Sequence, residues 1–267
     1  MKCMQVPLGE EGAYLETYFL EESPEMCNSH SHTAVLICPG GAYAICSDRE
    51  AEPVAMAFCA RGFSAAVLRY PVCPHRFPTQ LKAAARAMAW MKEHGKEFAL
   101  DPEKIAVAGF SAGGHLAASL GVFWNAPFLQ KETGLQKESM RPWKMILGYP
   151  VITSGEFSHA YSFRCLLGED FGNRDKMELV SLEKQVTRDT PATFLWNTVT
   201  DPAVPAENTL LFAMALRKAR VPFELHMYSQ GNHGLSLANA VTVNAQGDGL
   251  EPCCEGWLPM AADWLRR

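Results

Sequence analysis

The sequence predicts an α/β fold in which a mostly parallel central sheet carries helices on both faces. The first observation is that short apolar runs, typical of buried strands, alternate with stretches rich in helix formers. The second is that a serine between glycines, in Gly109-Phe110-Ser111-Ala112-Gly113, falls between one such run and one such stretch. The third is that the 267 residues contain no repeat, low-complexity tract or linker, which favours a single domain spanning residues 1–267.

The strands and helices are expected in a regular order. Residues 1–33 form a lead-in with an edge strand at 13–20, and the first central strand follows at 33–38. Asp101-Pro102 is expected to form a turn that leads into the strand before Ser111. Further strands are expected at 63–70, 104–108, 144–149, 193–197 and 222–228, and helices at 50–61, 79–93, 114–120, 206–219 and 256–267.

Residues 153–190 interrupt this alternation. They are mixed and charged, contain Gly155, Gly168 and Gly172, and include no strong strand pattern. An insertion at this point would lie over the carboxyl edge of the sheet, which favours a small cap or lid. An ordinary surface excursion explains the composition equally well, and both interpretations stay open.

The composition excludes several classes of function. A formal net charge of −5 gives no basic surface for nucleic acid or anionic membranes, and no apolar stretch is long enough to cross a bilayer. The amino terminus lacks the apolar segment of a signal peptide. The nine cysteines are odd in number and include no C-x-x-C pair, so we expect no disulfide framework, no zinc site, and a reducing, cytoplasmic location.

His30 and His32 are close enough in sequence to be considered as a metal-binding pair. They precede an expected strand, whereas ligand sites in open α/β sheets gather at the carboxyl ends of strands. A solvated loop is therefore the preferred interpretation of these two histidines, and the sequence predicts no metal site.

Ser111 is the candidate nucleophile. A nucleophile elbow holds its serine in a strained conformation between a strand and a helix, and side chains two residues to either side would collide with those elements. The helix that starts here directs free N–H groups toward a developing negative charge. The five-residue pattern alone occurs by chance in many chains, so the strand before it and the helix after it carry the interpretation.

His233 is the candidate general base, because a serine hydroxyl is a poor nucleophile until a base takes its proton. It lies between Gly231 and Gly234 in a loop after the last expected strand, at the sheet edge where Ser111 is expected. An ordinary turn histidine is the alternative. The other histidines have weaker support as a base. His115 is expected to cap or pack on the helix after the serine, and His226 to lie in the last strand. The remaining three are expected in loops or at a helix end: His75, His94 and His159.

The third member of such a site is a carboxylate that orients the histidine and stabilises its positive charge. Asp201 directly follows the strand at 193–197, whereas Asp189 precedes that strand and Glu207 enters the next helix. An ordinary Asp-Pro turn is the alternative interpretation of Asp201. The resulting order along the chain, serine then aspartate then histidine, differs from that of the chymotrypsin and subtilisin classes.

The backbone N–H groups of Gly41, Ala42 and Ala112 are the candidate oxyanion donors. Ala112 directly follows the candidate nucleophile, and Gly40-Gly41-Ala42 follows the first central strand. Small residues let this backbone approach a substrate, and the loss of one such donor typically lowers the rate about a hundredfold. A plain Gly-Gly turn is the alternative.

Together these motifs resemble those of the acetyl-xylan-esterase-like and hormone-sensitive-lipase-like carboxylesterases of the α/β-hydrolase superfamily. The resemblance covers most of residues 34–236 and implies an α/β-hydrolase fold with a small cap insertion. It also implies a serine hydrolase that needs no metal or organic cofactor. The similar segments are the elbow block at 101–118, the tyrosine-to-proline loop at 69–78, the Asp-Pro-Ala-Val-Pro pattern at 201–205 and the Asn-His-Gly pattern at 232–234.

Two departures from the lipase-like branch narrow the expected substrate. Pro39 and Ala42 stand where that branch usually has a histidine and a third glycine, and its long amino-terminal cap helices are missing. Ala42 keeps its N–H group, but its methyl group narrows the acyl site. Both departures favour the small esterases that resemble sugar deacetylases, and that resemblance implies hydrolysis of short acyl esters, acetyl above all, of carbohydrates or small alcohols. We expect no nucleic-acid or membrane partner, and the oligomeric state stays open.

Two other functions fit the same residues. A small peptidase or amidase of the prolyl-oligopeptidase-like branch shares the Asp-x-x-Val-Pro pattern, although no propeller domain precedes the expected sheet; the fold alone cannot choose a substrate. A binding module without activity is the other alternative, and the presence of Ser111, Asp201 and His233 together argues against it.

Overall fold

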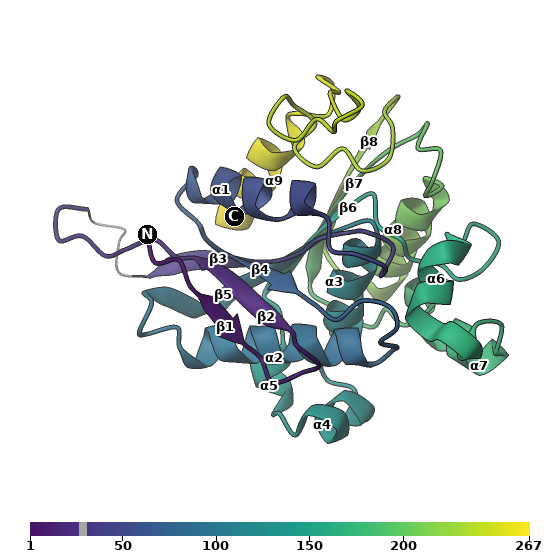
Figure 1. Ribbon diagram of the computed structural model, residues 1–267, viewed down its shortest axis with the longest axis horizontal. Helices are drawn as coiled ribbons and strands as arrows, with labels where there is room; N and C mark the ends of the chain where they lie inside the picture. Colours follow the sequence, from purple (N-terminus) through teal and green to yellow (C-terminus); the bar gives the residue numbers. More distant parts are fainter. Residues whose placement is uncertain (27–30) are drawn as a thin grey trace.

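One sheet of eight strands forms the centre of the computed structural model, which describes residues 1–26 and 31–267 (Figure 1). The strands lie in the order β1-β2-β4-β3-β5-β6-β7-β8. The neighbouring strands from β4 through β3 to β8 pair in parallel. The strand β2 pairs antiparallel with both of its neighbours, β1 and β4. This confirms the predicted mostly parallel sheet. The strands are β1 Gln5–Pro7, β2 Tyr14–Tyr18, β3 His32–Cys38, β4 Ser64–Arg69, β5 Leu100–Phe110, β6 Lys144–Gly148, β7 Ala192–Thr198 and β8 Phe223–Tyr228.

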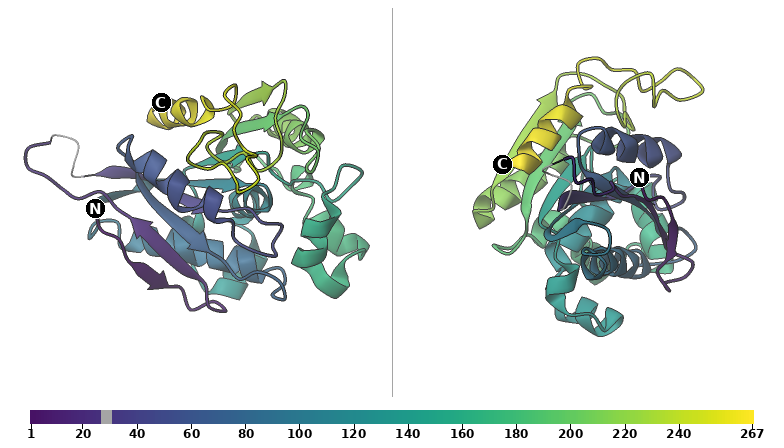
Figure 2. Two further views of the ribbon diagram at one scale, coloured as in Figure 1. Left: turned by 45° about the horizontal axis from the view of Figure 1, so that its top comes forward. Right: turned by 90° about the vertical axis from the view of Figure 1, so that its left-hand side faces the viewer.

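Helices cover both faces of this sheet (Figure 2). Neighbouring residues of β3 enter different cores: Leu36 packs in the core that includes α2, α3 and α8, and Ile37 packs in the core that includes α1 and α9. This is the burial expected of a strand covered on both faces. The helices are α1 Glu52–Cys59, α2 Thr79–Glu93, α3 Ala112–Phe123, α4 Pro127–Thr133, α5 Lys137–Met140, α6 Ala160–Leu167, α7 Arg174–Leu179, α8 Glu207–Ala219 and α9 Trp257–Arg266, with short 3₁₀ helices η1 Asp48–Glu50, η2 Gly168–Asp170 and η3 Leu182–Lys184.

The structure corrects two details of the predicted strands. The strand expected at the sheet edge is β2, and it lies one place inside, because the three-residue β1 pairs with its outer side. The expected turn at Asp101-Pro102 lies within β5, although its turn chemistry is retained. The Asp101 carboxylate accepts a hydrogen bond from the Glu103 N–H at 2.9 Å, and the pairing of β5 with β3 shifts register at this point.

The segment 153–190 folds into α6, η2, α7 and η3 and contains no strand, as expected. Figure 1 shows α6 and α7 beside one end of the sheet. The segment is attached at its base, where buried Phe163, Leu166 and Leu182 join the core that includes α3. Its backbone is also bonded to the neighbouring loop, because the Phe77 N–H donates to the Leu166 carbonyl at 2.9 Å.

Membrane-spanning helices, metal sites and disulfides can be assessed only for the residues that the structure describes. Within residues 1–26 and 31–267, no helix combines the length and hydropathy that a bilayer span requires, and no three metal-ligating side chains cluster. His30 lies outside the described residues. His32 begins β3 and is buried, so it does not lie in the solvated loop that we expected. The eight cysteines of the described part are all free thiols.

Candidate active site

Ser111 lies at the sharp corner between β5 and α3, with φ 54° and ψ −123°. A side chain at residue 109 would collide with the backbone of Gly113, and a side chain at residue 113 would collide with the carbonyl groups of Cys38 and Pro39. Only glycine avoids both collisions, because it has no Cβ atom. The local sequence therefore allows α3 to start close against the ends of β3 and β5, with the serine at the turn.

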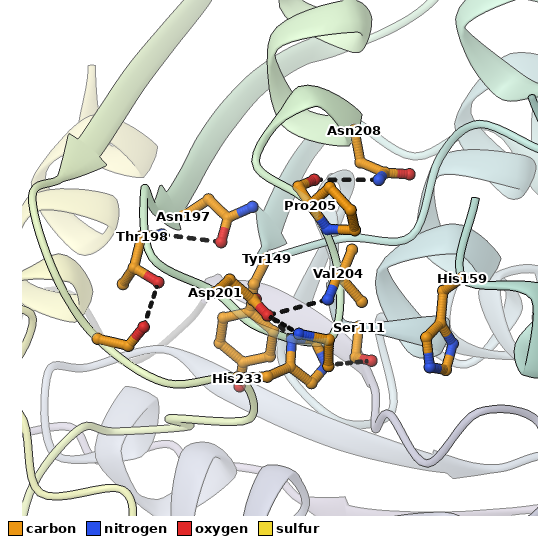
Figure 3. A network of polar contacts seen from close by, with 12 residues as sticks. Ser111, Tyr149, His159, Asn197, Thr198, Asp201, Val204, Pro205, Asn208 and His233 are labelled. Atoms are coloured by element: carbon orange, nitrogen blue, oxygen red, sulfur yellow. Dashed lines mark hydrogen bonds and ion pairs between the residues drawn. The ribbon is translucent and has the colours of Figure 1, made fainter. Parts of the chain in front are cut away.

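His233 joins Ser111 to Asp201 in a chain of hydrogen bonds (Figure 3). Its Nε2 atom lies 2.7 Å from the Ser111 Oγ atom, and its Nδ1 atom lies 2.6 Å from the Asp201 Oδ2 atom. An ionised carboxylate only accepts hydrogen bonds, so Nδ1 carries the proton and Nε2 is free to accept the serine proton. The structure thus brings together the three predicted side chains, which come from loops after β5, β7 and β8.

Asp201 is held by hydrogen bonds on both of its oxygen atoms. Its Oδ1 atom accepts from the N–H groups of Ala203 and Val204, each at 2.9 Å, in the turn that precedes α8. The side chain has no exposed surface. These bonds hold the carboxylate in an orientation that faces His233. A carboxylate must be oriented in this way to select one tautomer of the histidine. The Asp-Pro turn considered as an alternative is therefore present, and it is the element that positions the carboxylate.

The loop that carries His233 is tied to the loop after β7. The Thr198 and Thr200 hydroxyl groups donate to the Gly231 carbonyl at 2.8 and 3.2 Å, and the Gly231 N–H donates to the Thr200 hydroxyl at 3.0 Å. On its other side the imidazole contacts the Tyr149 ring edge-on, with 5.1 Å between ring centroids. Both contacts limit the rotation of the histidine relative to the serine.

The N–H groups of Gly41, Ala42 and Ala112 are available to a substrate. None of the three donates a hydrogen bond to an acceptor in the described residues. By contrast, the Gly40 N–H donates to the Glu50 Oε2 atom at 2.7 Å, so Gly40 is excluded as a donor to a substrate. Ala112 is the first residue of α3, where N–H groups have no partner within the helix.

Glu50 is a component of the site that the sequence did not reveal. It is buried, and its two oxygen atoms bridge two walls of the site: one accepts from Gly40, and the other accepts from the Tyr149 hydroxyl at 2.6 Å. The same hydroxyl accepts from the Ser236 N–H at 2.8 Å. Burial, and secondarily the Glu50 charge, raise the pKa of Tyr149. The Tyr149 hydroxyl therefore stays protonated and donates its hydrogen bond to Glu50. The loop at residues 40–42, which is the candidate oxyanion loop, is thus joined to the loop that carries His233 through the buried Glu50 carboxylate and Tyr149.

The remaining histidines lie as follows. His115 is fully buried on α3, where it accepts from the Tyr43 hydroxyl and donates to the Val180 carbonyl, so it packs as predicted. His226 lies in β8 and bonds Glu224. His159 directly precedes α6, so it lies at a helix end as expected, and Figure 3 shows that it also lies near Ser111. The sequence carried no signal for this, because the approach of α6 to Ser111 depends on tertiary packing.

The mostly parallel sheet, the elbow and the three side chains that follow β5, β7 and β8 define an α/β-hydrolase. A solved structure confirms this class: the acetyl ester-xyloside bifunctional hydrolase from Caldicellulosiruptor lactoaceticus superimposes with a TM-score of 0.85 at 35% identity, covering 99% of this chain and 96% of that one. Residues 23–216 match the family model described as BD-FAE, and the chain belongs to this family of α/β-hydrolase esterases.

Two curated relatives indicate the chemistry of similar proteins. Endo-1,4-beta-xylanase B of Butyrivibrio fibrisolvens is 39% identical over 211 residues, which cover 77% of this chain and 33% of that protein. An acetylxylan esterase of Xylanibacter ruminicola is 27% identical over 243 residues, which cover 88% of this chain and 46% of that protein. The chain thus spans about a third to a half of the length of these relatives.

Proposed function

We propose that this protein is a serine carboxylesterase that hydrolyses acetyl and other short acyl esters of sugars or small alcohols through an acyl-enzyme. The observation that carries the proposal is the hydrogen-bonded chain from Ser111 through His233 to Asp201. Relatives named for acetylxylan and acetyl ester-xyloside hydrolysis support the acetyl group and the sugar.

In the proposed reaction His233 takes the proton of Ser111 as the serine oxygen attacks the ester carbonyl. Asp201 holds the imidazole in the required tautomer and stabilises its positive charge. The N–H groups of Gly41, Ala42 and Ala112 bind the oxyanion. His233 then protonates the departing alcohol, and a water molecule repeats the sequence to release the acid.

The segment 153–190 is proposed to act as a small cap on a single domain. Its supports are the position of His159, which directly precedes α6, near Ser111, and the buried attachments at the base of the segment, which favour a fixed rim over a mobile lid. A cytoplasmic location is proposed from the absence of disulfides among the described cysteines.

Labelling with a fluorophosphonate tests the proposed nucleophile. We expect stoichiometric labelling of the native protein and none of the Ser111→Ala variant. Esters from acetyl to octanoyl then test the acyl site, with a steep fall in kcat/KM expected beyond butyryl. Turnover of aminoacyl anilides in preference to p-nitrophenyl acetate would instead indicate the peptidase, and an unlabelled native protein would contradict the esterase.

A further inference from the structure

His159 belongs to the segment 153–190, and Figure 3 shows it near Ser111 and His233. It directly precedes α6 and is half-buried. Figure 3 shows its ring on the opposite side of Ser111 from His233. The charges of His233 and Asp201 both influence the pKa of His159. A group bound to the serine would therefore lie close to both imidazoles.

The orientation of the His159 ring is fixed by Ser162. Its Nδ1 atom lies 2.8 Å from the Ser162 Oγ atom, and Ser162 is fully buried. Within the described residues this nitrogen is the sole hydrogen-bond partner of the hydroxyl. We assign the hydroxyl as the donor and Nδ1 as the acceptor, because the buried O–H group would otherwise have no acceptor. The proton of the neutral ring then resides on Nε2, which has no partner in the described part of the chain.

The charge state of His159 agrees with this role as a neutral donor. Burial, followed by the positive charge of His233, lowers the pKa of His159, and the carboxylate of Asp201 opposes this effect only in part. The ring is thus uncharged near neutral pH. An uncharged ring does not oppose the positive charge that His233 acquires during the proposed reaction.

We propose that the His159 Nε2–H group binds a hydroxyl group on the carbon next to the acylated oxygen, and so selects a polyol or sugar as the alcohol half of the ester. This inference rests on the proposed esterase function. In that reaction His233 protonates the departing alcohol oxygen, so the alcohol half lies next to His233 and within reach of the opposite imidazole. A single neutral donor suits a hydroxyl oxygen better than a carboxylate, which prefers a cation.

A simple alkyl alcohol would leave this donor without a partner. A site built to hydrogen-bond a substrate hydroxyl discriminates against analogues that lack it, because the polar group of the protein is then desolvated and unpaired. The proposal therefore places selection for the sugar in the segment 153–190, and selection for the short acyl group in the loop that contains Ala42.

The test is a cycle of two changes, one in the protein and one in the substrate. The substrates are a methyl xyloside carrying one acetyl group beside a free hydroxyl, and its counterpart in which that hydroxyl is replaced by hydrogen. For the native protein we expect kcat/KM to fall by roughly tenfold or more when the hydroxyl is removed. For the His159→Phe variant, which keeps a ring but has no donor, we expect the two substrates to be hydrolysed equally.

Three controls separate binding from folding. His159→Gln supplies an amide N–H donor and is expected to recover part of the discrimination. Ser162→Ala removes the bond that orients the ring and is expected to reduce it. His75→Phe makes the same change at a histidine whose side chain is 38% exposed and whose Nδ1 atom lies 4.0 Å from the Glu11 Oε2 atom, and it is expected to behave as the native protein. Turnover of p-nitrophenyl acetate, which carries no such hydroxyl, is measured for every variant, so that a general loss of activity is separated from a loss of discrimination between the two xylosides.

The outcomes distinguish the two proposals. If the native protein hydrolyses neither p-nitrophenyl acetate nor the acetylated xyloside, the proposed function is wrong. If it hydrolyses both, but removal of the hydroxyl lowers kcat/KM equally in the native protein and in His159→Phe, the esterase stands and the role of His159 is overturned.

Discussion

At the scale of single residues, the site includes side chains that take no part in the proposed proton transfers. Ser111, His233 and Asp201 are recognisable in the sequence because each follows an apolar strand, and parallel strands end at one edge of the sheet. Glu50 and His159 are not recognisable. They belong to elements that reach the site only through packing of η1 and α6, and no local pattern encodes that packing.

Glu50→Gln tests the buried bridge between the oxyanion loop and Tyr149. The amide can accept from only one of its two present donors, so either the Gly40 N–H or the Tyr149 hydroxyl loses its acceptor. We expect kcat for an acetyl ester to fall about tenfold or more with little change in KM, because oxyanion donors act mainly in the transition state. We also expect a loss of about 1–3 kcal/mol in the free energy of unfolding, measured with urea.

Asp48→Asn is the matched control, since it makes the same change two residues away on a side chain that is 89% exposed. Its activity should equal that of the native protein. If Glu50→Gln retained full kcat, the bridge would have no part in positioning the oxyanion loop.

Asp201→Asn tests the carboxylate itself. The amide presents either an oxygen or an N–H group to His233, and its N–H form would impose the wrong tautomer on the ring. We expect kcat to fall by about a thousandfold or more while the fold is kept, as judged by steady-state kinetics and circular dichroism. A loss smaller than tenfold would mean that another group orients His233.

At the scale of elements, the sequence predicted the alternation of strands and helices well. The helix expected at 79–93 is α2 with the same bounds, because its helix formers form a periodic apolar pattern that packs on the sheet. The place of β2 inside the sheet edge was missed, since β1 is a strand of three residues. The helices α4 and α5 were also missed, because they are short and their sequences lack a long apolar period.

Gly113→Ala tests the close approach of α3 to the strand ends. The new methyl group would collide with the carbonyl groups of Cys38 and Pro39, which the sheet holds in place. We expect the free energy of unfolding to fall by about 1–3 kcal/mol, and the activity to fall with it because Ser111 and the oxyanion loop are pushed apart. Urea denaturation and acetyl ester hydrolysis measure the two effects.

Gly256→Ala is the control for this substitution. Gly113 lies in the first turn of α3, and Gly256 lies at the start of another helix, α9. A Cβ atom at residue 256 would meet nothing within 4 Å, so no loss of stability is expected. Equal stability of the two variants would show that the elbow tolerates a side chain.

At the scale of the whole molecule, a buried histidine makes the stability of the folded state depend on pH. His115 lies between the Tyr43 hydroxyl and the Val180 carbonyl and so links α3 to the oxyanion loop and to the segment 153–190. Burial lowers its pKa to about 4. In the unfolded chain a histidine binds its proton near pH 6.5, so between these values the unfolded state binds more protons than the folded state.

Stability should therefore decrease as the pH falls from about 6.5 to about 4, by up to roughly 3 kcal/mol from this residue. Urea denaturation across this range measures the loss. Carboxylates also titrate here, so the quantity of interest is the difference from His115→Gln, in which the pH dependence should be weaker. Parallel curves for the two proteins would contradict the coupling.

The central claim is that Ser111 carries the acyl group during turnover. The most direct measurement is rapid acid quenching of the native protein during hydrolysis of p-nitrophenyl acetate, followed by mass spectrometry of its peptides. We expect an acetyl group on the peptide that contains Ser111, and its absence from that peptide in Ser111→Ala. Steady turnover with no acetylated Ser111, or with the acetyl group on a different side chain, would contradict it.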